Sequence, residues 1–227
     1  MNYTIKYLSD TLEFPPAKDS KIMQEAQVAE ISQVREESSV HIPKTIARIF
    51  YKDDAIYVNF HVKDRYVKSV HTDYGASVCR DSCVEFFIQP KEDAGYFNFE
   101  VNCGGCLHLS YIKDCTRTKD GFKDFSMVDK DIANKIKIYH SMPETVFEEI
   151  TDPVEWDIAL EIPFSVFEYY IGSLTIDEKS HWKGNLYKCA DDTSHPHWLT
   201  WAPVMGKLNF HKPEYFQTFK FEKRTNK

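Results

Sequence analysis

The segment VEFFIQPKEDAGYFNFEVN, residues 84–102, decides the fold class of this chain. Two runs of alternating apolar and polar side chains flank the turn-rich connection PKEDAG, and this pattern predicts a β-hairpin. If both strands bury their apolar faces in one core, the expected cross-strand pairs are Val84 with Val101 and Phe86 with Phe99.

That register also places Glu85 directly opposite Glu100, with Asn98 and Tyr96 on the same face. Like charges that face each other across a hairpin are unfavourable unless something bridges them. One interpretation is a solvated outer face, and another is a bridge through Arg80, a lysine, a cation or the hydroxyls of a ligand. A third is a glycosidase pair, which needs carboxyl groups ~5–5.5 Å or ~6.5–9.5 Å apart.

Working outward, the same alternation recurs in three further segments, at 46–51, 56–62 and 156–162. Short strands separated by turn signals predict an all-β fold, a single immunoglobulin-like or jelly-roll-like β-sandwich of mostly antiparallel strands. One or two short helices are expected, at IPFSVF (162–167) and within 22–40, which has the only other helical composition. Without a repeat or a Gly/Ser-rich linker, residues 1–227 are predicted to form one domain.

Composition narrows the class of partner. The chain has 227 residues, 15% aromatic residues and a formal net charge of −7, so a sizeable core is expected and a nucleic-acid partner is not. The densest basic segment, KDCTRTKDGFKD at 113–124, contains its own aspartates and is interpreted as a solvated loop.

No apolar run approaches the ~18 residues that a membrane-spanning helix needs, so no membrane partner is expected. The N-terminus, MNYTIKYLSDTLEF, lacks the continuous apolar region of a signal peptide. Six cysteines are compatible with free thiols in a reducing compartment. A cytoplasmic location is therefore expected, or an extracellular one if a leader was removed from this sequence.

Several motifs carry a family resemblance when taken in order along the chain: RDSCVEFFIQP (80–90), YFNFEVNCGG (96–105), WDIALEIPFSVF (156–167), WKGNLYKCADD (182–192), HPHWLTWAPV (195–204) and FHKPEYF (210–216). Over roughly residues 20–222 the chain resembles the family 9 carbohydrate-binding modules and their DOMON-type β-sandwich relatives. The resemblance implies a non-catalytic protein that holds a mono- or oligosaccharide between aromatic rings and polar side chains. A glycoside hydrolase using Glu85 and Glu100, or a module for haem or another small ligand, are the alternatives.

The resemblance also implies which residues contact sugar. Trp201 matches the family's platform tryptophan, Tyr74 lies where the second ring falls, and Trp182 matches a packed tryptophan. Near Glu100 the family often carries a basic residue, so this chain departs from the pattern there. The predicted ligand-binding residues are Tyr74, Glu85, Tyr96, Asn98, Glu100, Asn185, Tyr187, Asp191, Trp198 and Trp201.

The cysteine spacing comes close to that of a structural zinc site, with Cys79-x3-Cys83 followed by Cys103-x2-Cys106. Packing at the strand ends already explains Cys83 and Cys103, so no metal or other cofactor is expected. A structural calcium ion is left open, because calcium prefers carboxylate oxygens and four aspartates could supply some, namely Asp53, Asp54, Asp191 and Asp192. The sequence does not indicate an oligomeric state.

Overall fold

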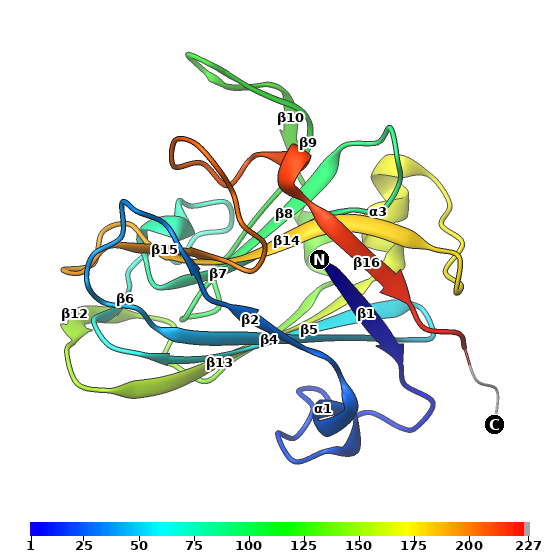
Figure 1. Cartoon of the computed structure of the whole chain (residues 1–227), viewed down its shortest axis with the longest axis horizontal. Coiled ribbons are helices and arrows are strands. Elements are labelled where there is room, and N and C mark those ends of the chain that lie inside the picture. The colour runs from blue at the N-terminus through cyan, green and yellow to red at the C-terminus, as the bar shows by residue number, and fades with distance from the viewer. Residues whose placement is uncertain (225–227) are drawn as a thin grey trace.

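The computed structural model describes residues 1–224, which form a β-sandwich of two layers (Figure 1). The first sheet follows the order β10 (Gly121–Met127), β9 (Leu107–Thr118), β8 (Tyr96–Asn102), β7 (Cys83–Gln89), β14 (His181–Ala190), β16 (Gln217–Phe221) and β1 (Asn2–Tyr7). Next to β14 on this layer lies β15 (His197–Thr200), which also pairs with β3 (Gln33–Val34).

The second sheet consists of β2 (Val28–Ile31), β4 (Lys44–Lys52), β5 (Ala55–Asp64), β13 (Val154–Pro163) and β11 (Lys137–His140). Strand β1 joins the two sheets at one edge, since its first residues pair in parallel with β16 and its last two with β4. A separate short ribbon pairs β6 (Val67–Ser69) with β12 (Val146–Ile150). The β-sandwich predicted from the alternation is confirmed.

The hairpin that decides the fold has the predicted register. Strands β7 and β8 are antiparallel, with Val84 opposite Val101, Phe86 opposite Phe99, and Glu85 opposite Glu100. The apolar members of these pairs are fully or almost fully buried between the sheets. Burial of one face fixes the register, because a slip by one residue would turn Phe86, Phe97 and Phe99 out of the main core.

The helices are short, as expected: α1 (Lys21–Glu25), α2 (Lys130–Ala133), α3 (Phe164–Ile171), and the 3-10 turns η1 (Val78–Arg80) and η2 (Pro213–Tyr215). Within residues 1–224 there are three α-helices where one or two were predicted, and α2 is the one that was not predicted. The helix predicted at 162–167 begins at Phe164, directly after Pro163. Only the start of the 22–40 segment is helical, and β2 and β3 follow it. Residues 113–124 are largely exposed, as expected, but they are not a loop, because they belong to the β9–β10 hairpin that projects from the sandwich (Figure 1).

One end of the core contains a buried ion pair between the sheets. The ammonium of Lys188 on β14 lies 3.4 Å from a carboxylate oxygen of Asp64 on β5, and both side chains are fully buried. The Trp156 indole donates to the same Asp64 oxygen at 3.2 Å. Burial opposes ionisation of Asp64, but Lys188 and the His41 ring bonded to it hold the pKa of that carboxyl below its usual range.

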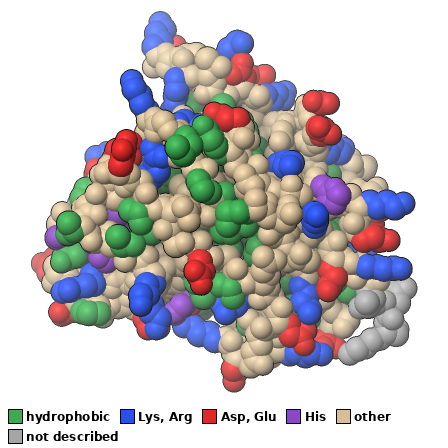
Figure 2. All heavy atoms as spheres, viewed as in Figure 1, with side chains coloured by type: hydrophobic (Ala, Val, Ile, Leu, Met, Phe, Trp, Pro, Cys, Tyr) green, Lys and Arg blue, Asp and Glu red, His purple; other side chains and the backbone are tan. Residues whose placement is uncertain are grey.

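Acidic and basic side chains are interspersed over the face seen in Figure 2, without a continuous basic stripe. Among residues 1–224, no helix has the length and apolar character required to cross a membrane.

Candidate functional site

A cavity of about 490 Å³ opens on the outer face of the first sheet. This volume lies within the range of pockets that hold small molecules. Its lining comes from η1, β7, β8, β9, β14, β15 and the segments on either side of β15: Cys79, Glu85, Glu100, Arg117, Cys189, Asp191, Trp198, Lys207, Leu208, Asn209, Phe210 and His211. Four of the ten predicted binding residues are in this set, namely Glu85, Glu100, Asp191 and Trp198.

The segment between β15 and β16 covers much of this face. Phe210 stacks on Tyr187 with ring centroids 4.2 Å apart, and the Tyr187 hydroxyl donates to the Phe210 carbonyl at 3.1 Å. As a result Glu85 and Glu100 are only 3% and 7% exposed. The interpretation of these glutamates as solvated is therefore wrong, because loop aromatic residues far along the sequence close over them.

Each glutamate is held by one neutral donor. The Cys189 thiol donates to Glu85 Oε1 at 3.1 Å, and the Asn98 amide donates to Glu100 Oε1 at 2.7 Å. Asn98 is itself fixed, since its Oδ1 accepts the backbone N–H of Ser110 at 2.8 Å. Among the described residues, neither Glu85 nor Glu100 forms an ion pair, and no protein donor reaches their second oxygens.

The bridge considered from the sequence, Arg80, is engaged elsewhere. Its guanidinium pairs with Asp192 at 2.5 Å, outside the cavity lining. The second carboxyl oxygens of Glu85 and Glu100 are thus among the hydrogen-bond acceptors that the cavity offers to a ligand.

Electrostatics at this site disfavour negative charge. Burial, reinforced by the facing Glu100 carboxyl, raises the pKa of Glu85 well above its usual value. Burial also raises the pKa of Glu100 and of Asp191, although His108 and Arg117 partly oppose this at Glu100. A protonated carboxyl can donate one hydrogen bond as well as accept others, so this group of three can match hydroxyls in either role.

Trp198 forms one side of the cavity. Strand β15 pairs with β14 so that Trp198 lies opposite Cys189, on the same face as the glutamates. Its indole N–H donates to Asp191 Oδ1 at 2.7 Å, which holds both side chains in place while the ring stays half-buried. The site therefore combines an oriented aromatic ring with carboxyl groups beside it.

Trp201 lies on the opposite face of the sheet. It is 4% exposed and packs between the sheets against Phe219 and Tyr3, with ring centroids 5.2 and 6.1 Å away. The prediction of an exposed platform ring at Trp201 is wrong, because alternation from β15 directs Leu199 and Trp201 inward and Trp198 outward.

Tyr74 also lies outside the lining. Its ring packs on the main core, and its hydroxyl donates to the Val128 carbonyl at 2.6 Å. The prediction that Tyr74 faces Trp201 across a ligand is therefore wrong.

Four other predicted residues support the cavity from behind without lining it. Asn98 holds Glu100, and Tyr187 lies beneath Phe210. The Asn185 amide group bonds the backbone of Ala202 at 3.0 and 3.1 Å, so it fixes the chain beyond β15. Tyr96 is buried and shares a 2.9 Å hydrogen bond with His211.

Sequence reasoning missed the basic and imidazole groups of the lining. Arg117 reaches the cavity from the end of β9, where its guanidinium lies 4.2 Å from the Phe122 ring centroid. Burial, with Arg117 nearby, lowers the pKa of His211 to about 3, so its ring is neutral. The interleaved aromatic residues of 113–125 were the signal for Arg117, since a solvated loop rarely carries them.

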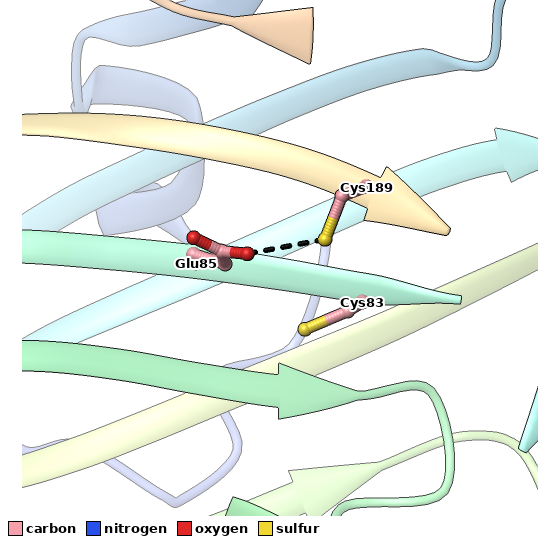
Figure 3. A group of neighbouring side chains, drawn as sticks. All are labelled: Cys83, Glu85 and Cys189. Carbon is pink, nitrogen blue, oxygen red and sulfur yellow. Dashed lines mark hydrogen bonds between the residues drawn. The ribbon is translucent and has the colours of Figure 1, made fainter. Parts of the chain in front are cut away.

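The deepest part of the site contains a possible metal-ligand group. Cys83, Glu85 and Cys189 place one sulfur or oxygen atom each within 4.8 Å of one another (Figure 3). Neither the cysteine set nor the aspartates considered from sequence form such a group within residues 1–224. All six cysteines are free. Burial raises the pKa of Cys83 to about 12, so its thiol stays protonated unless a cation displaces the proton.

Comparison with known proteins identifies the family. The model of carbohydrate-binding family 9 matches residues 17–221. A crystal structure from Bacteroides uniformis, of a protein proposed to bind carbohydrate, superposes with a TM-score of 0.83 at 27% identity, covering 97% of this chain and 99% of that one.

Two structures of a family 9 carbohydrate-binding module from Caldicellulosiruptor kristjanssonii share the fold at 12% identity. The complex with cellotriose has a TM-score of 0.64 and the complex with glucose 0.63; each covers the whole of this chain, and 96% and 98% of the respective module. No curated protein matches the sequence. The chain belongs to carbohydrate-binding family 9.

Proposed function

We propose that this protein is a non-catalytic carbohydrate-binding protein that holds a mono- or short oligosaccharide in the cavity on the first sheet. The carrying observation is the pairing of the Trp198 indole with three carboxyl groups in one cavity of about 490 Å³. Flat apolar faces of sugar rings pack on aromatic side chains, while their hydroxyls need hydrogen-bond partners. The related modules that bind cellotriose and glucose support a ligand of this class.

The cavity presents more acceptors than donors at its floor. Glu85 and Glu100 each have an oxygen that no protein donor reaches, and hydroxyl groups would supply those donors. Hydrogen bonds between neutral groups contribute roughly 0.5–1.5 kcal/mol each, and these two contacts are expected to orient the sugar. The Trp198 ring would then contribute the apolar contact beside them.

Hydrolysis is the weaker function for the same carboxyl pair. A glycosidase needs one carboxyl protonated and the other ionised, which requires environments that separate their pKa values. Here burial raises the pKa of both Glu85 and Glu100. We therefore expect binding without turnover.

Calorimetric titration with glucose, cellobiose and a panel of other mono- and oligosaccharides tests the proposal. We expect saturable binding of at least one sugar and no product release on prolonged incubation. Glu100→Gln should weaken that binding, while Glu178→Gln, an exposed glutamate in the loop after α3, should not. Failure of every sugar to bind, or sustained product release that Glu100→Gln abolishes, would overturn the proposal.

A further inference from the structure

A second cavity, of about 410 Å³, lies on the outer face of the other sheet. Its floor is a row of directly paired residues that crosses four strands: Arg48 on β4, Asn59 on β5, Ala159 on β13 and Tyr139 on β11. The segment before α1, from Pro15 to Lys18, also lines it, and Figure 1 shows α1 beside this sheet, away from the first one.

Two buried donors in this cavity have no partner. Arg48 Nε and Asn59 Nδ2 are inaccessible to solvent, and no acceptor among the described residues lies within hydrogen-bond range of either atom. Asn59 is only 7% exposed. An unsatisfied buried donor is costly, and native proteins rarely keep two of them side by side. They belong to directly opposite residues of β4 and β5, and both residues line the cavity.

The acidic group of the cavity is already engaged. Asp157 lies 2.9 Å from the Lys18 ammonium and 2.8 Å from the His61 ring, and it forms no ion pair with Arg48. The lining therefore contains two full cations, Lys18 and Arg48, and one carboxylate. An uncompensated guanidinium beside a free amide N–H favours an anionic oxygen ligand.

The rest of the wall is apolar. Met23, Ile46, Pro15 and Pro16 line the space together with the Tyr139 ring. A ligand that fits this wall has an apolar or ring-shaped body. The single free guanidinium, with Asp157 nearby, suits a singly charged group better than a phosphate dianion, because a second negative charge would face that carboxylate.

We propose that this cavity binds a small organic carboxylate, whose oxygens accept hydrogen bonds from Arg48 and Asn59 and whose body packs on Tyr139 and Met23. The site lies on the opposite layer from the sugar cavity, so the inference stands independently of the proposed function.

Benzoate is the probe, benzamide is its uncharged counterpart, and inorganic phosphate tests the alternative anion. Titration is followed by nuclear magnetic resonance of the Arg48 Nε–H and Asn59 amide signals. We expect benzoate to shift both signals saturably and benzamide to bind at least ~10-fold more weakly. Absence of any benzoate effect, or tighter binding of phosphate than of benzoate, would overturn the assignment.

Variants add a second measurement, the thermal midpoint of the ligand-free protein, which does not depend on the affinity for benzoate. Arg48→Met and Asn59→Leu each remove an unpaired donor, so both should raise the thermal midpoint of the free protein while lowering benzoate affinity by ~10-fold or more. The matched control is Arg65→Met, because Arg65 Nε already donates to the Thr151 carbonyl at 2.9 Å. Benzoate binding to Arg48→Met with wild-type affinity would show that the guanidinium does not hold the ligand.

Discussion

The two outer faces of the sandwich differ in the kind of hydrogen-bonding group that they leave free. On the first sheet, the free groups are carboxyl oxygens of Glu85 and Glu100. On the second sheet, they are the N–H groups of Arg48 and Asn59. Both pairs occupy directly opposite positions on neighbouring antiparallel strands. In each cavity, two opposite outward residues of a strand pair supply the free groups, which are acceptors on the first sheet and donors on the second.

The difference shows that the hydrogen-bonding groups of an outer face are set by a few outward-facing residues and by the segment that covers them. The inward residues of both strand pairs are apolar and belong to one core. Covering segments turn outward polar residues into buried ones, which the residues before β16 do on one side and those before α1 on the other. The predictions below test whether the two faces act independently.

The largest expected effect comes from removing a ring that both faces depend on. Trp201→Ala should lower the free energy of unfolding by about 3–5 kcal/mol, because it deletes a buried indole from the shared core. Urea denaturation monitored by circular dichroism measures this. Full stability with loss of sugar binding would instead place Trp201 in the site.

Trp198→Ala should affect one face alone. Loss of the half-buried ring is expected to weaken sugar binding by about 1–3 kcal/mol, by analogy with other aromatic stacking platforms. It also removes the indole N–H that orients Asp191. Benzoate affinity on the other face should stay at the wild-type value, and a change there would show that the two faces are coupled.

Trp198 and Trp201 also show how much of the site can be predicted from the sequence. The strand pattern at 84–102 fixed the register of the glutamates, because one face of each strand is entirely apolar. Both tryptophans belong to or directly follow strand β15, His197–Thr200. Extending the alternation through this strand would have directed Trp198 outward and Trp201 inward.

The covering segments could not be predicted in the same way. Phe210 meets Tyr187 through tertiary packing between residues that share no local pattern. Phe210 lines the cavity together with Glu85, whose burial raises the pKa of that carboxyl. Arg48 and Asn59 have the pattern of ordinary outward residues of an alternating strand, and the segment from Pro15 to Lys18, which lines the same cavity, shares no local pattern with them.

A smaller effect, on stability, is expected from replacing Glu85 in the cavity of the first sheet with an uncharged residue. The folded-state pKa of Glu85 is raised above its unfolded value, so the folded protein binds the proton more tightly. Stability linked to this group is therefore fully present below the unfolded pKa and is lost as pH rises through the folded pKa. Glu85→Gln should remove that loss, and its stability should exceed that of wild type increasingly at higher pH.

Thermal midpoints of both proteins across the pH range measure the difference, with Glu178→Gln as the exposed control. If the thermal midpoints of wild type and Glu85→Gln change with pH in parallel, ionisation of Glu85 does not destabilise the folded protein.

The smallest expected effect concerns metal at the first face. Cys83, Glu85 and Cys189 could approach a cation, but zinc in structural sites takes four ligands and this group supplies three. The Cys189 hydrogen bond to Glu85 and the raised pKa of both thiols mean that zinc would have to displace two protons. We expect elemental analysis of the purified protein to give far less than one equivalent of zinc, and added zinc to leave the thermal midpoint unchanged. A stoichiometric zinc ion that is lost in Cys189→Ser and kept in Cys115→Ser would contradict this. The Glu85 cavity would then hold a positive charge, as the Arg48 cavity does. The two faces would differ in the type of ligand that each binds and not in the sign of their charge.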